Sequence, residues 1–102
     1  MVSRVSLSKD QAKAQLNQCV QNGNVIYTGH FQKELANDKL TMSDVLTVCR
    51  SGLVIDEPEV DMRTGNWKYR IEGLNSDSER LAVVFAFGDS VNAVFITVFR
   101  RM

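Results

Sequence analysis

The chain has 102 residues with 12 basic and 12 acidic side chains, so its formal net charge at neutral pH is zero. This length is typical of one domain around one hydrophobic core. We expect a single domain over residues 1–102, with a helical part at about residues 8–51 and a sheet part at about residues 53–100. Hydrophobic residues make up 44% of the chain and charged residues 24%, which argues against disorder. The charge balance excludes a generally polycationic nucleic-acid binder but allows a local basic face.

Cys19 and Cys49 are the only cysteines, too few for a disulfide scaffold or a four-thiolate metal site. Both fall on the apolar side of a helical pattern, so we expect buried thiols in a reducing compartment. The longest apolar runs are much shorter than the roughly 20 residues of a membrane helix, and the N-terminus has no apolar signal core. These features predict a cytoplasmic chain with no membrane contact.

Helices are expected in the first half of the chain. Residues 8–11 form a capping-box pattern that opens a helix ending near Gly23. Residues 25–28 form a short extended segment, too brief to assign firmly. A second helix is expected from Gly29 to about residues 37–38.

Thr41 to Asp44 form a second capping box, which opens a third helix that stops at Gly52. Beyond Gly52 the apolar period changes to two. Four strands are expected, at about residues 53–55, 67–72, 81–87 and 94–99. Residues 88–90 are expected to form a turn between the last two strands. The fold class is therefore α+β, with N-terminal helices packed on one face of a four-stranded, mainly antiparallel meander sheet.

Candidate chemistry is limited to a few side chains. His30 is the only histidine, and the chain has no phosphate-binding glycine loop or nucleophile elbow, so no metal and no cofactor are expected. His30 follows Gly29 at the expected helix start, and Glu34 lies one turn later on the same helix face. His30 is thus a candidate acid or base, the alternative being an ordinary polar or capping residue.

Lys68 and Arg70 lie two residues apart on one expected strand, so both project from the same face. If helices cover the opposite face, these cations could hold a phosphodiester and stabilise charge on a pentacoordinate phosphorane. The alternative is a solvated strand face with Glu72 as the neutralising neighbour. On the last strand, alternation places Thr97 on the side of Phe95 and Phe99.

The segment HFQKELANDKLTMSDVL, which begins at His30, resembles the opening motif of an uncharacterised bacterial domain family. The family pattern is approximately His-Ala-x-x-Arg-Met-x-x-Arg-Gly-Ile-(Ser/Thr)-x-x-(Asp/Glu)-Val. The resemblance continues through a strand around Tyr69, a strand at residues 83–84 and a final strand at residues 96–99. It covers about residues 27–100.

This family is similar to the RelE/BrnT-type bacterial toxins, which place two helices before a four-stranded antiparallel sheet. The resemblance implies metal-independent RNA cleavage, with His30 as base or acid and Thr97 as a phosphate contact. We add Arg100 as a second candidate for RNA binding. The catalytic roles of Lys68 and Arg70 come from strand alternation and not from the family pattern.

Glu34 and Asp38 stand where the family has arginines, and a carboxylate beside a phosphodiester repels it. Three hypotheses therefore remain open, because one fold hosts several activities. The first is a small metal-independent ribonuclease that acts on RNA and is degenerate at these two positions. The second is a non-catalytic member that binds an antitoxin or another protein, or forms a homodimer. The third is a domain that binds a small ligand between helices and sheet.

Overall fold

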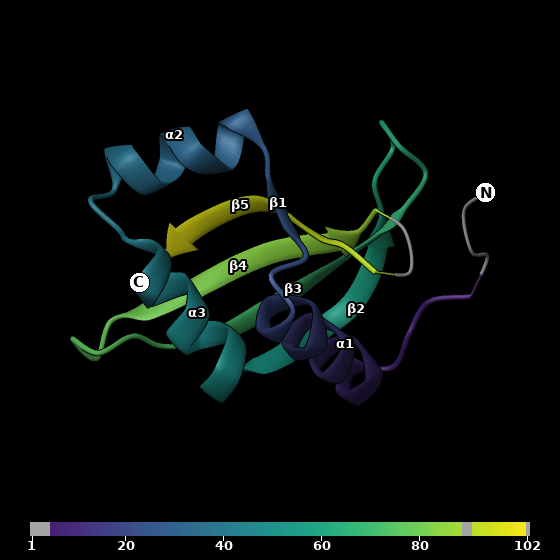
Figure 1. Ribbon diagram of the computed structural model, residues 1–102, viewed down its shortest axis with the longest axis horizontal. Coiled ribbons are helices and arrows are strands. Elements are labelled where there is room, and N and C mark those ends of the chain that lie inside the picture. The colour runs from purple at the N-terminus through teal and green to yellow at the C-terminus, as the bar shows by residue number, and fades with distance from the viewer. Residues whose placement is uncertain (1–4, 89–90, 102) are drawn as a thin grey trace.

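The computed structural model describes residues 5–88 and 91–101, and within them three helices and five strands form an α+β fold (Figure 1). The helices are α1 (Lys9–Gln21), α2 (Gly29–Asn37) and α3 (Met42–Ser51). The strands are β1 (Val25–Tyr27), β2 (Leu53–Val60), β3 (Trp67–Leu74), β4 (Arg80–Phe87) and β5 (Ala93–Arg100). Of the turn expected at residues 88–90, residues 89 and 90 lie outside the described part of the chain.

Both expected capping boxes are present. The Ser8 hydroxyl accepts from the Gln11 backbone N–H at 3.1 Å, and the Gln11 side chain accepts from the Ser8 N–H at 3.0 Å. At α3, Thr41 and Asp44 make the same reciprocal pair. Each pair satisfies two backbone groups at the start of its helix, so the sequence pattern correctly located these two helix starts.

The sheet differs from the expected one in having a fifth strand. The strand order is β1-β5-β4-β3-β2, with β1 parallel to β5 and the other neighbours antiparallel. The expected antiparallel meander is therefore the β2–β5 part of a mixed sheet. β1 has only three residues, too few to show an alternating pattern, and its partner strand lies far along the chain.

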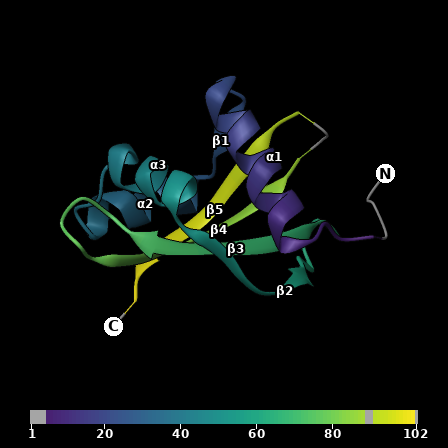
Figure 2. The same cartoon turned by 90° about the horizontal axis from the view of Figure 1, so that it is seen from below.

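α1 and α3 cover one face of the sheet and leave the other face open (Figures 1 and 2). Large, fully buried side chains from both layers form the core: Leu16, Phe31, Val45, Val48, Ile71, Leu81, Val83, Phe85, Phe95 and Val98. Cys19 and Cys49 are buried thiols outside any disulfide, and burial raises the pKa of Cys49 to about 12. In residues 5–88 and 91–101, no helix is long and apolar enough to cross a membrane.

The helices were expected on one face of the sheet. α1 and α3 lie there, but α2 covers an edge of the sheet. β1 pairs with β5 only along residues 93–95. Farther along β5, the Thr28 hydroxyl donates to the Ile96 carbonyl at 3.2 Å, and the Glu34 carboxylate accepts from the Val98 N–H at 3.4 Å. An exposed strand edge carries unpaired backbone donors and acceptors. Thr28, the N-cap of α2, and Glu34, within α2, satisfy two such β5 groups beyond the part that pairs with β1.

The sheet approaches α3 most closely at a pair of glycines. A Cβ added to Gly52, at the end of α3, would lie 2.5 Å from the Glu72 carbonyl oxygen and 2.6 Å from that of Val48. A Cβ added to Gly73 on β3 would lie 2.8 Å from the Gly52 Cα. Neither position has room for a side chain, so the two glycines set the distance between α3 and β3.

Candidate functional site

Arg70 and Thr97 lie on one row across three neighbouring strands. Arg70 pairs with Val84 on β4, and Val84 pairs with Thr97 on β5. Directly opposed residues share a face, so both side chains project from the open face. Strands lie about 4.8 Å apart, which places the two backbones roughly 10 Å apart.

A bulge in β5 puts Thr97 on this face. The partner of Val84 is Thr97 but the partner of Phe85 is Phe95, so Ile96 is an extra residue. Phe95 and Val98 are therefore both buried in the core, and Thr97 faces the other way. The expectation that Thr97 shares a side with Phe95 is wrong, because strict alternation does not anticipate the extra residue.

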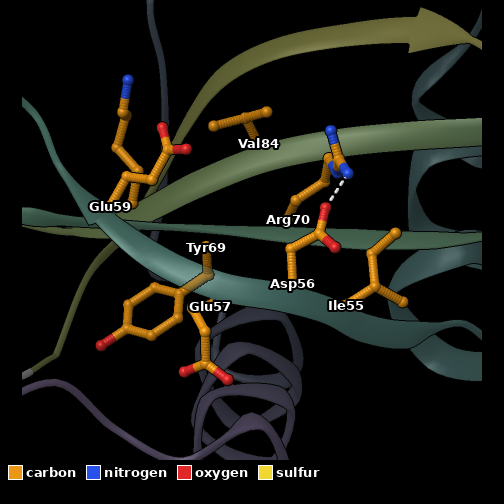
Figure 3. A pocket seen from close by; sticks show the side chains of 8 residues that line it. Ile55, Asp56, Glu57, Glu59, Tyr69, Arg70 and Val84 are labelled. Atoms are coloured by element: carbon orange, nitrogen blue, oxygen red, sulfur yellow. Dashed lines mark hydrogen bonds and ion pairs between the residues drawn. The ribbon is translucent and has the colours of Figure 1, made fainter.

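Arg70 is surrounded by carboxylates. It forms an ion pair with Asp56, and its Nε lies 3.3 Å from Glu72 Oε2 (Figure 3). Asp56 has a φ of 61° at the point where the β2–β3 register shifts, which turns its side chain to the face of Arg70. The Glu72 side chain is only 7% exposed. The positive charge of Arg70 is thus offset by one exposed and one buried acid.

Lys68 lies two residues before Arg70 on β3 and on the same face, as alternation predicts. It is paired across the strands with Glu59, but it forms no ion pair with any residue of the described segments. It lines a cavity of about 130 Å³ together with Asp56, Glu59 and Arg70. Figure 3 shows Tyr69 and Glu57 on the opposite side, toward α1. Lys68 is therefore a cation with neighbouring acids but no fixed partner.

His30 and Thr97 are connected by Glu34. His30 Nε2 lies 3.1 Å from Glu34 Oε1, and the Thr97 hydroxyl donates to the same oxygen. The His30 side chain is 68% exposed and that of Glu34 is 26% exposed. The four-residue spacing correctly predicted the proximity of His30 and Glu34. It could not reveal Thr97, which joins them through the tertiary fold.

Arg100 is held away from the other candidates. Its Nε donates to Glu79 at 2.8 Å, and a terminal nitrogen donates to the Asp38 carbonyl oxygen at 2.7 Å. Arg100 pairs with Leu81, a core residue, so its side chain leaves β5 on the side opposite to Thr97. Hydrogen bonds from Asn75 and then from Arg100 hold the pKa of Glu79 below its usual value. Arg100 therefore ties the end of α2 to the β3–β4 turn.

The candidate residues thus form two connected groups and one outlier. His30 and Thr97 share Glu34, Arg70 and Lys68 lie along the open face from Thr97, and Arg100 is engaged elsewhere. In the segments that the structure describes, no three His, Cys, Asp or Glu side chains are grouped so that they could hold a metal ion.

A family model described as a domain of unknown function, DUF4258, matches residues 27–100. The chain belongs to the DUF4258 family. The match bears out the resemblance to an uncharacterised domain family, and it spans every candidate residue discussed above. α1 precedes the DUF4258 match but supplies Ala12, Leu16 and Cys19 to the core. No curated protein and no solved structure matches the chain.

Proposed function

We propose that this DUF4258 chain is a small metal-independent endoribonuclease, similar to the RelE/BrnT-type toxins. One observation carries the proposal: a single Glu34 oxygen contacts both His30 Nε2 and the Thr97 hydroxyl, and Thr97 lies on the same cross-strand row as Arg70. An acid–base group, a hydroxyl and a cation are thus arranged along one edge and face of the sheet.

RNA cleavage without a metal needs few groups. A base takes the proton of the ribose 2′-hydroxyl, whose oxygen attacks the adjacent phosphorus. An acid protonates the departing 5′-oxygen, which leaves a 2′,3′-cyclic phosphate and a new 5′-hydroxyl. A cation stabilises the extra negative charge on the phosphorane between these steps.

His30 is the acid–base group in this proposal: its ring takes the 2′-hydroxyl proton, and solvent water protonates the departing 5′-oxygen. Its ring is exposed, and the contact between Nε2 and Glu34 orients it and leaves Nδ1 for the substrate. A carboxylate next to an imidazole fixes the orientation of the ring. Thr97 contacts a phosphate oxygen when its hydroxyl turns from Glu34.

Arg70 supplies the positive charge. It must exchange Asp56 for a phosphate, and Asp56 is 65% exposed. Exposed ion pairs contribute only about 0–1 kcal/mol, so a phosphate can replace this carboxylate at small cost. Lys68 adds a second charge on the same face.

The test is cleavage of a single-stranded RNA oligonucleotide by the purified chain in EDTA. We expect products with 2′,3′-cyclic phosphate ends, and His30→Ala to lower the rate about 100-fold or more, the usual contribution of an acid–base group. The thermal unfolding midpoint of His30→Ala should stay unchanged, because the ring is exposed. Gln32→Ala, at an exposed position on α2, is the matched control. Absence of cleavage, or full activity in His30→Ala, overturns the proposal.

A specific observation favours the protein-binding alternative as second candidate. Arg70 and Arg100 both pair with acids within the chain, so these two charges are offset before any phosphate arrives. If the chain leaves RNA intact and its expression is harmless, a non-catalytic member that binds a protein partner becomes the better proposal.

A further inference from the structure

We propose that Arg101 and Arg70, both held by the buried carboxylate of Glu72, form a two-arginine clamp for an RNA phosphate. This inference rests on the proposed function and adds the residues of the same site that would contact the phosphate backbone of the RNA. It assigns Glu72 as a positioning residue and Arg101, not Arg100, as the phosphate-binding arginine at the end of β5.

Both arginines approach one oxygen of Glu72 from the open face. Glu72 Oε2 lies 3.3 Å from Arg70 Nε and 3.4 Å from Arg101 Nε. The backbone N–H of Arg101 donates to the Arg80 carbonyl at 2.8 Å, which fixes where its side chain begins. Glu72 thus holds two guanidinium groups beside one another, one from β3 and one from the residue that follows β5.

These contacts are ionic and do not include an aligned hydrogen bond. Neither Arg70 Nε nor Glu72 Oε2 has a hydrogen-bond partner among the described residues, although both atoms are buried. The side chains of Arg70 and Arg101 are 29% and 45% exposed. Buried polar groups without hydrogen bonds are costly, so a phosphate that draws the guanidinium groups into better alignment would relieve this cost.

The charge of the group favours an anion. Glu72 cancels one of the two arginine charges, and Asp56 cancels the other in the free chain. When a phosphate replaces the exposed Asp56, Arg70, Arg101 and Glu72 together carry one net positive charge, and the N–H groups of two guanidinium groups can donate to the phosphate. Paired guanidinium groups are well suited to phosphate oxygens, because each can donate two parallel hydrogen bonds.

Space for the attached nucleoside lies next to the clamp. A cavity of about 460 Å³ is lined by Glu72 and Arg80 and by the apolar side chains of Leu53, Ile55 and Leu74. Small-molecule sites commonly have volumes of about 300–1,000 Å³. Leu53 and Leu74 are 67% and 50% exposed, so a base could cover apolar surface there.

The test is binding of a fluorescent 2′-O-methyl RNA oligonucleotide, which lacks the attacking hydroxyl and stays uncut. Anisotropy titrations over a range of NaCl concentrations give the affinity and its salt dependence. We expect Arg101→Gln to weaken binding several-fold and to reduce the slope of log K against log salt by about 0.7, the value for one phosphate on a single strand. Arg101→Lys should restore most of the slope. Arg50→Gln, with the same charge change in the last turn of α3, should leave it unchanged.

The Glu72→Gln variant tests whether Glu72 positions the two arginines or only offsets their positive charge. If Glu72 only offsets charge, its removal strengthens RNA binding; if it positions both arginines, binding weakens despite the added positive charge, and we expect the second result. Thermal unfolding identifies a variant that fails to fold, and in that case the salt slope of Arg101→Gln alone tests the clamp. An unchanged salt slope in Arg101→Gln overturns the clamp even if the chain cleaves RNA. Binding with the expected slopes but no cleavage of ordinary RNA supports the clamp and overturns the ribonuclease.

Discussion

Glu34 on α2 and Thr97 on β5 are 63 residues apart in sequence and share a hydrogen bond from the Thr97 hydroxyl to the Glu34 carboxylate. The same carboxylate oxygen accepts from the Val98 backbone and contacts His30. Glu34 therefore fastens α2 to the sheet edge and orients the proposed acid–base group. An arginine, which the family pattern has here, could accept neither of these hydrogen bonds.

Glu34→Ala should lower the free energy of unfolding by about 1–2 kcal/mol, because it leaves the Thr97 hydroxyl and the Val98 N–H without their acceptor. Urea unfolding measures the change. Lys33→Ala, at the neighbouring exposed position of the same helix, is the control and should change stability little. Equal stability of the two variants would show that the contact does not hold α2.

Gly52→Ala should destabilise the fold by about 1–3 kcal/mol, the usual cost of forcing a methyl group into a packed site. The added Cβ meets backbone oxygens, which cannot rotate away as a side chain could. Gly29→Ala is the matched control, since its Cβ would have nothing within 4 Å. Chemical denaturation of both variants checks the prediction, which fails if Gly52→Ala is as stable as Gly29→Ala.

Asp56→Asn should strengthen RNA binding, because it removes the charge that pairs with Arg70. Asparagine suits the backbone here, since it tolerates the positive φ of 61°. Anisotropy with the uncut RNA probe measures the affinity. Asp77→Asn makes the same charge change in the β3–β4 turn, so a similar gain there would point to net charge alone and not to release of Arg70.

The acid sensitivity of the fold should depend partly on Glu79. Its pKa is lowered in the folded chain by the Asn75 hydrogen bond and then by Arg100. The unfolded chain therefore binds this proton more readily, so the stabilisation is present above the unfolded pKa and is lost as pH falls through the folded one. Urea midpoints from about pH 6 to about pH 3 should fall less steeply in Glu79→Gln than in the parent chain.

Glu57→Gln serves as the control for this acid titration. The Glu57 carboxylate accepts no hydrogen bond from the residues that the structure describes, and Figure 3 shows it directed away from Arg70. A parent-like profile for Glu79→Gln would mean that its contacts do not contribute to acid sensitivity.

Local sequence signals identified much of this fold. Capping boxes mark helix starts because side-chain and backbone groups three residues apart satisfy each other. Alternation on β3 placed Lys68 and Arg70 on the open face because strand side chains have a period of two. The extended segment at residues 25–28 was expected, but its parallel pairing with β5 was missed, as was the bulge at Ile96, because both depend on pairing between segments far apart in the sequence.

The candidate site was only partly predictable for the same reason. The helical spacing of His30 and Glu34 is a local property, but the contact of Glu34 with Thr97 is not. Arg100 ends β5 and Arg101 follows it; the two are chemically alike, so only their contacts in the fold distinguish them. One joins α2 to the β3–β4 turn, and the other lies beside Glu72.

The outer strand β2 has a further consequence. Its pairing register shifts between Ile55 and Glu59, and Pro58 within that stretch has no N–H to offer a neighbour. A strand from another molecule would meet an interrupted ladder and a row of negative charge there. The β2 edge therefore disfavours strand-to-strand association between molecules. The sheet face that α1 and α3 leave open can stay exposed without the chain polymerising through β2.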